Sequence, residues 1–216
     1  MMWFAALALM SMPIEKRVTD VRSLFSVNDF PEYLVREGTF RIVYTRTTVG
    51  PDGSLQNCTV EASSGDAKLD AYTCALIVKR ARFSAARWTD GSPAYGLIRV
   101  PVSWIATGAP LSDEEVLKAF LPSLKLSVNQ LPKGARSIAG VGLQIAADEK
   151  GRILACDQGP PVLSPRKKRF SELIPVACKQ VMETLTVPVP RDGAGKPVRS
   201  IQNLSVHFKL ERRRPR

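Results

Sequence analysis

The chain carries the same cysteine-bearing pattern twice. A glycine stands five positions before the first cysteine of each pair, Gly53 before Cys58 and Gly151 before Cys156. The second cysteine of each pair is followed at +17, +19 and +30 by a glycine, a proline and an aromatic residue: Gly91, Pro93 and Trp104 after Cys74, and Gly195, Pro197 and Phe208 after Cys178. This agreement predicts two tandem copies of one folding unit, because a fixed spacing repeated along a chain indicates a repeated architecture.

The four cysteines are predicted to form two disulfides, one in each copy: Cys58 with Cys74, and Cys156 with Cys178. Neither pair has the short spacing of a zinc site, and the chain has a single histidine to complement them. No metal site and no cofactor is therefore expected. Disulfides indicate an oxidising compartment. The alternative is four buried thiols in a cytosolic protein.

A length of 216 residues accommodates two small domains. The repeat places them at 28–106 and 112–210, followed by a basic tail at 211–216. Residues 1–13 contain an apolar run at 3–12. This run is too short for a membrane span, which needs about 20 residues, and it suits the core of a weak signal peptide. The alternative is that the true start lies upstream.

Both copies have the same order of predicted elements: a helix, two strands joined by a turn, a second helix and a closing strand. The predicted ranges are 31–36, 40–49, 55–62, 67–82 and 97–105 in the first copy, and 113–121, 141–147, 153–157, 172–184 and 200–210 in the second. Apolar residues follow Cys74 and Cys178 at +3 and +7 on one helical face, and that face is expected to lie on the sheet.

Several short motifs in the first copy occur in the order typical of one family. They are Asp29-Phe30-Pro31, Val49-Gly50-Pro51-Asp52-Gly53, Cys58-Thr59-Val60, Ser63-Ser64-Gly65, Leu69-Asp70, Arg82-Phe83 and Asp90-Gly91. In these motifs residues 28–106 resemble the TonB C-terminal domain family. The second copy resembles that family only through the repeat, since Gly159-Pro160-Pro161 and a basic run replace the Ser-Ser-Gly and Leu-Asp motifs.

The resemblance implies an α+β fold of two tandem units, each a three-stranded antiparallel sheet with helices packed on one face. It also implies a periplasmic, non-catalytic protein of TonB-dependent transport, with an outer-membrane receptor or another envelope protein as its partner. Members of the family add an extended receptor peptide to a sheet edge, where backbone groups are unpaired. The residues predicted to contact the peptide are Asn28, Asp29, Phe30, Pro31, Leu97, Ile98, Arg99, Val100, Val102 and Trp104.

Family transducers also have a membrane helix and a long Pro-rich spacer, and neither is present in this sequence. We therefore expect partner binding without complete force transmission. One alternative is a membrane-anchored transducer whose start lies upstream and which associates with the inner membrane. Another is a basic structural protein of the envelope in which both sheet edges are closed. In one version of the binding hypothesis, the second unit covers an edge of the first.

Most of the net charge of +11 lies in residues 107–216, which carry 19 basic and 10 acidic side chains. The densest basic stretch comprises Arg166, Lys167, Lys168 and Arg169. Such a cluster attracts anionic membrane surfaces; the alternative is a solvated insertion. Aromatic residues do not alternate with these charges, so the bases of a nucleic acid would find no stacking platform and nucleic acid is not an expected partner.

No catalytic residue is predicted. The single histidine, His207, stands between Val206 and Phe208 in the last strand, and it is expected to be solvated on the face opposite that apolar pair. Ser63 and Ser64 precede a helix, where capping explains them better than nucleophilic catalysis. The sequence contains no nucleophile-elbow motif and no metal-binding helix motif.

Overall fold

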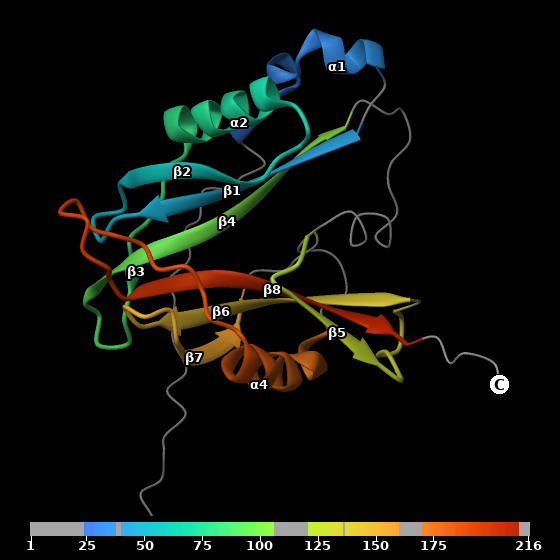
Figure 1. Ribbon diagram of the computed structural model, residues 1–216, viewed down its shortest axis with the longest axis vertical. Helices are drawn as coiled ribbons and strands as arrows, with labels where there is room; N and C mark the ends of the chain where they lie inside the picture. Colours follow the sequence, from blue (N-terminus) through green and yellow to red (C-terminus); the bar gives the residue numbers. More distant parts are fainter. Residues whose placement is uncertain (1–23, 38–39, 106–120, 136, 160–169, 212–216) are drawn as a thin grey trace, which may run out of the picture.

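The chain forms an α+β fold around one large sheet, as the computed structural model in Figure 1 shows. The described residues are 24–37, 40–105, 121–135, 137–159 and 170–211. Three predicted features therefore lie outside them: the leader at 1–13, the basic run at 166–169, and the helix at 113–121 apart from its last residue. The tail beyond Glu211 also lies outside.

The described elements follow one another in the predicted order, with two additional strands. They are η2 (Val27–Asp29), α1 (Glu32–Glu37), β1 (Phe40–Val49), β2 (Leu55–Ala62), α2 (Ala67–Arg80), β3 (Ala86–Arg87), β4 (Pro93–Ile105), β5 (Leu124–Val128), β6 (Ile138–Ala147), β7 (Ile153–Gln158), η3 (Ser171–Leu173), α4 (Ile174–Thr184) and β8 (Ser200–Leu210). The additions, β3 and β5, are short strands at the side of the sheet. β4 begins four residues earlier than predicted, at Pro93.

Six strands form one continuous path, β2-β1-β4-β8-β6-β7, while β3 pairs with β4 and β5 pairs with β8. The path consists of two three-stranded groups, β2-β1-β4 and β8-β6-β7. Pairing within each group is antiparallel throughout. The predicted three-stranded sheets are thus present, and they are joined into one sheet.

Glycine sets the turn of the hairpin in each group. Gly53 has φ +84° and Gly151 has φ +79°, a backbone conformation that L side chains rarely adopt. The chain that follows the helix also passes close to both turns. A Cβ would lie 2.6 Å from the carbonyl oxygen of Phe83 at position 53, and 2.2 Å from that of Val187 at position 151. Both positions therefore require glycine.

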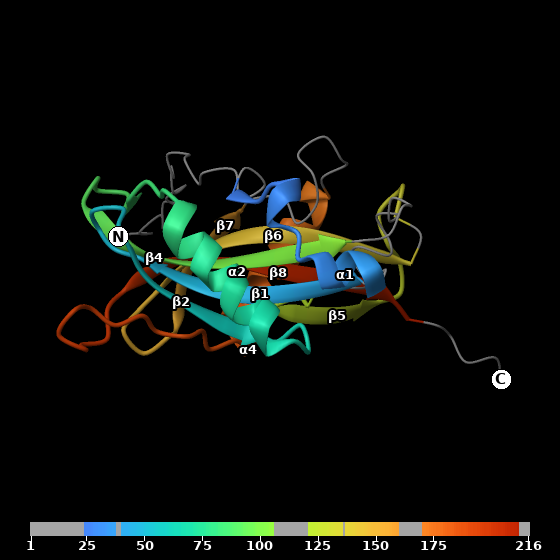
Figure 2. The same ribbon diagram turned by 90° about the horizontal axis from the view of Figure 1, so that it is seen from above.

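Each main helix covers the sheet of its own group. α2 begins after Asp66, whose carboxylate accepts hydrogen bonds from the backbone N–H groups of Lys68 and Leu69. Its predicted apolar face is buried, with Ile77 fully covered, and the same holds for Val181 of α4. Figure 2 shows α2 lying across β2 and β1. Burial of these faces supplies most of the core of each half.

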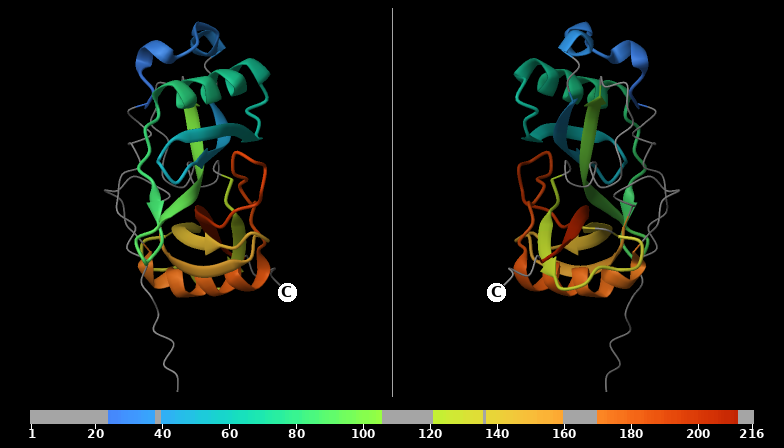
Figure 3. Two further views of the ribbon diagram at one scale, coloured as in Figure 1. Left: turned by 90° about the vertical axis from the view of Figure 1, so that its left-hand side faces the viewer. Right: turned by 90° about the vertical axis from the view of Figure 1, so that its right-hand side faces the viewer.

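The two groups meet through β4 and β8, which pair in parallel over Tyr95–Leu97 and Ser200–Gln202. Leu97 lies on the face of β4 turned away from α2, and its register partner Gln202 lies on the α4 side of β8. Because paired residues share a face of the sheet, α2 and α4 cover opposite faces. Figure 3 shows the two helices on opposite sides of the strands.

Both predicted disulfides are present. Cys58 and Cys74 connect β2 to α2, and Cys156 and Cys178 connect β7 to α4, with Cα–Cα distances of 5.7 and 5.6 Å. No free cysteine remains, since these four are all that the chain has. Each bond fixes a helix to an outer strand of its group, at the end of the sheet path.

Replacing both cysteines of either pair with serine should lower the free energy of unfolding by about 3 kcal/mol, because the unfolded chain regains the entropy of an open loop. The two losses should be similar, because the sequence separations of 16 and 22 differ little. Chemical denaturation of C58S/C74S and C156S/C178S measures both. Four alkylatable thiols in the native protein would contradict the prediction.

Candidate binding site at the junction of the two halves

The parallel contact between β4 and β8 is extended by one side chain. The backbone N–H of Arg99 donates to Oδ1 of Asn203 at 2.8 Å, and Nδ2 of Asn203 donates to the carbonyl oxygen of Arg99 at 3.3 Å. The N–H and C=O groups of Arg99 point away from β1. The side-chain amide of Asn203 forms hydrogen bonds with both of them, as the backbone of a neighbouring strand would. The junction reaches further along β4 than the backbone pairing alone.

Two arginines lie directly opposite each other beside this junction. Arg46 of β1 is the register partner of Arg99 of β4. Like charges in such a pair repel, and Glu61 of β2 lies between them, with ion pairs of 3.0 Å to Arg46 and 2.8 Å to Arg99. A register shift between β1 and β2 leaves Glu61 as an extra residue, because Tyr44 pairs with Ala62 and Thr45 with Val60. Such a bulge redirects a side chain.

Side chains of the first half also hold the chain where it enters the second half. The backbone N–H of Leu121 donates to Oη of Tyr44, and the carbonyl oxygen of Leu121 accepts from Nη1 of Arg99. The Arg99 guanidinium lies 5.0 Å from the centre of the Tyr44 ring, a cation–π arrangement. Burial raises the pKa of the Tyr44 phenol. Arg99 thus connects β4, β2 and the segment leading to β5.

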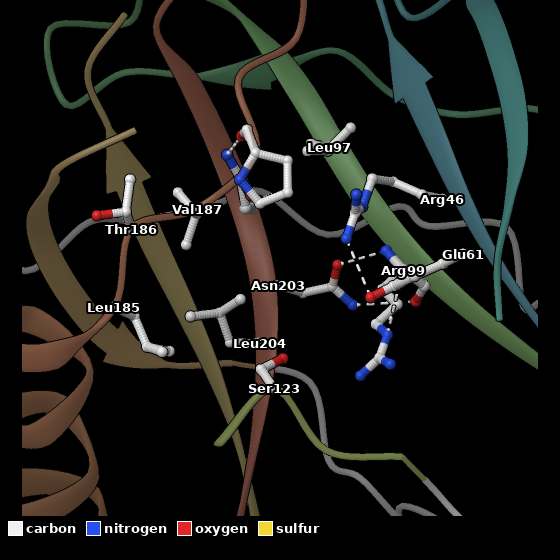
Figure 4. A pocket seen from close by; sticks show the side chains of 12 residues that line it. Arg46, Glu61, Leu97, Arg99, Ser123, Leu185, Thr186, Val187, Asn203 and Leu204 are labelled. Carbon is white, nitrogen blue, oxygen red and sulfur yellow. Dashed lines mark hydrogen bonds and ion pairs between the residues drawn. The ribbon is translucent and has the colours of Figure 1, made fainter. Parts of the chain in front are cut away.

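A cavity of about 140 Å³ opens at this place, between the uncovered face of the first half and the segment that follows α4. Its lining residues are Arg46, Glu61, Leu97, Arg99, Ser123, Leu185, Thr186, Val187, Pro188, Gln202, Asn203 and Leu204. Figure 4 shows Arg46 and Arg99 on either side of Glu61. The cavity has one charged wall, from the first half, and a wall of mixed apolar and uncharged polar side chains from the second.

The predicted binding residues of the last strand divide between two faces. Leu97 and Arg99 line the cavity. The other four, Ile98, Val100, Val102 and Trp104, belong to the core beneath α2. Sequence reasoning did not identify Arg46, Glu61 or Asn203, since their roles depend on strand register.

The prediction that β4 is an open edge is wrong for the first part of the strand. β8 pairs with Tyr95–Leu97, and Asn203 occupies the outward groups of Arg99. The next outward position is Pro101, which has no N–H to donate. An extended peptide would therefore find no ladder of free groups from Tyr95 to Pro101.

The predicted residues near the start of the domain lie on the α2 side, away from the cavity. The Asp29 carboxylate accepts from both terminal nitrogens of Arg80 at 2.6 and 2.7 Å, and these hydrogen bonds hold its pKa well below the usual range. The Phe30 ring meets the Trp104 ring edge to face, with centroids 5.6 Å apart. Asn28 is exposed and Pro31 half-buried. Asp29 and Phe30 thus fasten the N-terminal segment over the core.

The expectation that His207 is solvated is wrong. Its side chain is buried, with 2% of the residue exposed, because β6 and the unpredicted strand β5 flank it at Gly140 and Lys125. Its Nε2 atom has no hydrogen-bond partner in the described part of the chain. Burial, with the nearby charges of Lys125 and Arg99, lowers its pKa to about 4.

Two further kinds of feature are absent from the described part of the chain, metal-binding clusters and membrane-spanning helices. Within it, no group of three or more His, Cys, Asp or Glu side chains is arranged to hold a metal ion. In the same ranges, no helix combines the length and apolar character needed to cross a bilayer.

Residues 27–105 match the family model described as Gram-negative bacterial TonB protein C-terminal. This part of the chain therefore carries a TonB C-terminal domain, and its α+β architecture agrees with that fold. Domains of this family are non-enzymatic domains of the Gram-negative envelope that interact with outer-membrane receptors. The match ends at the last residue of β4 and does not include the second half. No curated protein and no solved structure matches the chain.

Replacing Asn203 with leucine should lower the free energy of unfolding by about 1–3 kcal/mol, since both outward backbone groups of Arg99 lose their partner. Asn57→Leu is the matched control, because this asparagine lies on the exposed strand β2, and its effect should stay within about 0.5 kcal/mol. Denaturation of the two variants gives the comparison. Equal losses would show that Asn203 does not join the halves.

Stability should fall as the pH falls, because His207 takes up a proton in the unfolded chain near pH 6.5 and in the folded chain only near pH 4. Its contribution is complete above pH 6.5, and about 2 kcal/mol should be lost between pH 7.5 and 5. Urea titrations at both values measure this loss. His207→Gln should remove the same amount of pH dependence; an unchanged slope would contradict this assignment.

Proposed function

We propose that this chain is a non-catalytic TonB-like protein of the periplasm that binds an extended segment of an envelope protein by adding it to the outer edge of β2. The class of partner follows from the family of residues 27–105, and an outer-membrane receptor is the first choice. The observation that carries the proposal is the position of β2 at the end of the sheet path, while β8 covers β4.

The outer side of β2 has the properties of an acceptor edge. Alternation along the strand directs the backbone groups of Cys58 and Val60 away from β1. Most of β2 is exposed, and Val60 is 39% exposed. The strand contains no lysine, arginine or proline, the residues that commonly protect an edge from further pairing. Disulfide-bonded Cys58 keeps β2 fixed against α2.

We also propose that the two halves are copies of one unit, with domains at 28–106 and 112–210. Corresponding details support this division beyond the cysteines. Arg87 bridges Pro93, and Arg191 bridges Pro197. Each arginine donates through Nη1 to the carbonyl oxygen of a glycine with positive φ, Gly91 in the first half and Gly195 in the second. All these residues recur at a spacing of 104 positions. In this proposal the second unit acts as a built-in partner that covers β4.

Hydrogen exchange tests the proposed edge. The amides of Cys58 and Val60 should exchange much faster than those of the central strands β1 and β4, because outward groups have no ladder partner. Peptides that copy the extended N-terminal segments of outer-membrane receptors from the same cell should slow these amides. Protection at β2 without any peptide would favour a structural protein with closed edges.

Proline substitutions on the two outer strands, β2 and β7, give a matched pair of variants that test which edge accepts the peptide. Val60→Pro removes an outward donor of β2, and Gln158→Pro makes the corresponding change on β7, the strand at the other end of the path. Peptide binding should be lost only in the first variant. Loss in the second variant alone would place the acceptor edge on β7.

A further inference from the structure

We propose that the cavity at the junction is a binding site for a carboxylate group of a protein partner, held by the guanidinium groups of Arg46 and Arg99. This proposal shares one assumption with the proposed function, namely that the binding partner is a protein. It names the group that the partner presents at a site separate from the β2 edge.

The charge of the site is unbalanced. Arg46 and Arg99 face each other across neighbouring strands, and Glu61 pairs with both, which leaves one positive charge in excess. The side chains of Arg46 and Arg99 are only 31% and 12% exposed. Water therefore screens this excess charge less than at a free surface. A second anion would relieve the repulsion that Glu61 relieves in part.

Hydrogen-bond donors also remain. A guanidinium group has five N–H donors. Arg46 uses Nη2 for Glu61, while Arg99 uses Nε for Glu61 and Nη1 for the carbonyl oxygen of Leu121. Among the residues that the structure describes, Nε and Nη1 of Arg46 and Nη2 of Arg99 have no hydrogen-bond partner. Figure 4 shows the Arg46 guanidinium extending into the cavity toward Asn203 and Leu97.

The size and walls of the cavity define the ligand. Its volume of about 140 Å³ is below the 300–1,000 Å³ typical of sites for whole small molecules, and it holds a group of a few atoms. A planar carboxylate matches the fork of a guanidinium with two parallel hydrogen bonds. Leu97, Leu185, Val187 and Pro188 offer apolar contact to the carbon atoms that carry the carboxylate. A C-terminal carboxylate and an acidic side chain share this chemistry.

NMR titration of the full chain tests the site, with the Nε–Hε signals of Arg46 and Arg99 as the readout. The probes are N-acetylglycine, which presents a C-terminal carboxylate, and N-acetylaspartic acid α-amide, which presents a side-chain carboxylate. N-acetylglycinamide is the neutral control, at constant ionic strength. One or both acids should give saturable shifts, and their relative affinity identifies the source of the group. The neutral amide should give none.

Variants distinguish specific binding at Arg46 and Arg99 from a nonspecific effect of positive charge. Arg46→Gln should weaken acid binding by about ten-fold or more, equivalent to one lost charge-assisted hydrogen bond. Arg36→Gln is the matched control, because Arg36 is an exposed arginine in an ion pair with Glu32 on α1, and it should leave binding unchanged. Glu61→Gln should strengthen binding several-fold, since it removes the competing carboxylate.

Three outcomes would overturn the proposal: equal shifts with the neutral amide, unchanged affinity in Arg46→Gln, or tighter binding of inorganic phosphate than of either acid. The Arg46→Gln comparison decides the matter even where Glu61→Gln does not fold. None of these outcomes affects exchange at Cys58 and Val60, so failure here is distinguishable from failure of the proposed β2 edge.

Discussion

The joined sheet depends on one amide acting in place of a strand. β8 runs beside β4 for only three register pairs and then pairs with β5 on the same side. Asn203 lies between these two stretches of strand pairing, and its side chain both accepts from and donates to the backbone of Arg99. The closure of β4 and the position of the cavity depend on this contact together with the three register pairs, and the opposite placement of α2 and α4 follows from the register of those pairs.

The electrostatics of the junction follow from a bulge. Arg46 and Arg99 become neighbours because β1 and β4 pair in a fixed register. Two guanidinium groups in that position are unfavourable without an anion between them. The extra residue in β2 is Glu61, and the bulge at that point brings its carboxylate to both arginines. One irregularity in the hairpin thus makes the charged wall stable while leaving a net positive charge.

The elements of each half could be predicted because their signals are local. Alternation and turn residues gave the bounds of β1, β2 and β8, and the cysteine spacing gave both disulfides. The junction could not be predicted, since a three-residue parallel contact between segments 105 positions apart leaves no periodic signal. His207 shows the same limit. Alternation correctly placed it opposite Val206 and Phe208, but its burial depends on β5, an unpredicted strand that pairs in parallel with β8.

The disulfides also determine how much of this chain can be drawn out under tension. When a polypeptide is pulled from its ends, residues enclosed by a covalent loop contribute no extension. The loops closed at Cys58–Cys74 and Cys156–Cys178 span 16 and 22 positions. At roughly 3.4 Å per extended residue, the two loops shorten the fully extended chain by about 55 and 75 Å. In both loops the segment withheld includes the first turns of the main helix, so under load each helix stays tethered to its outer strand after the sheet has separated.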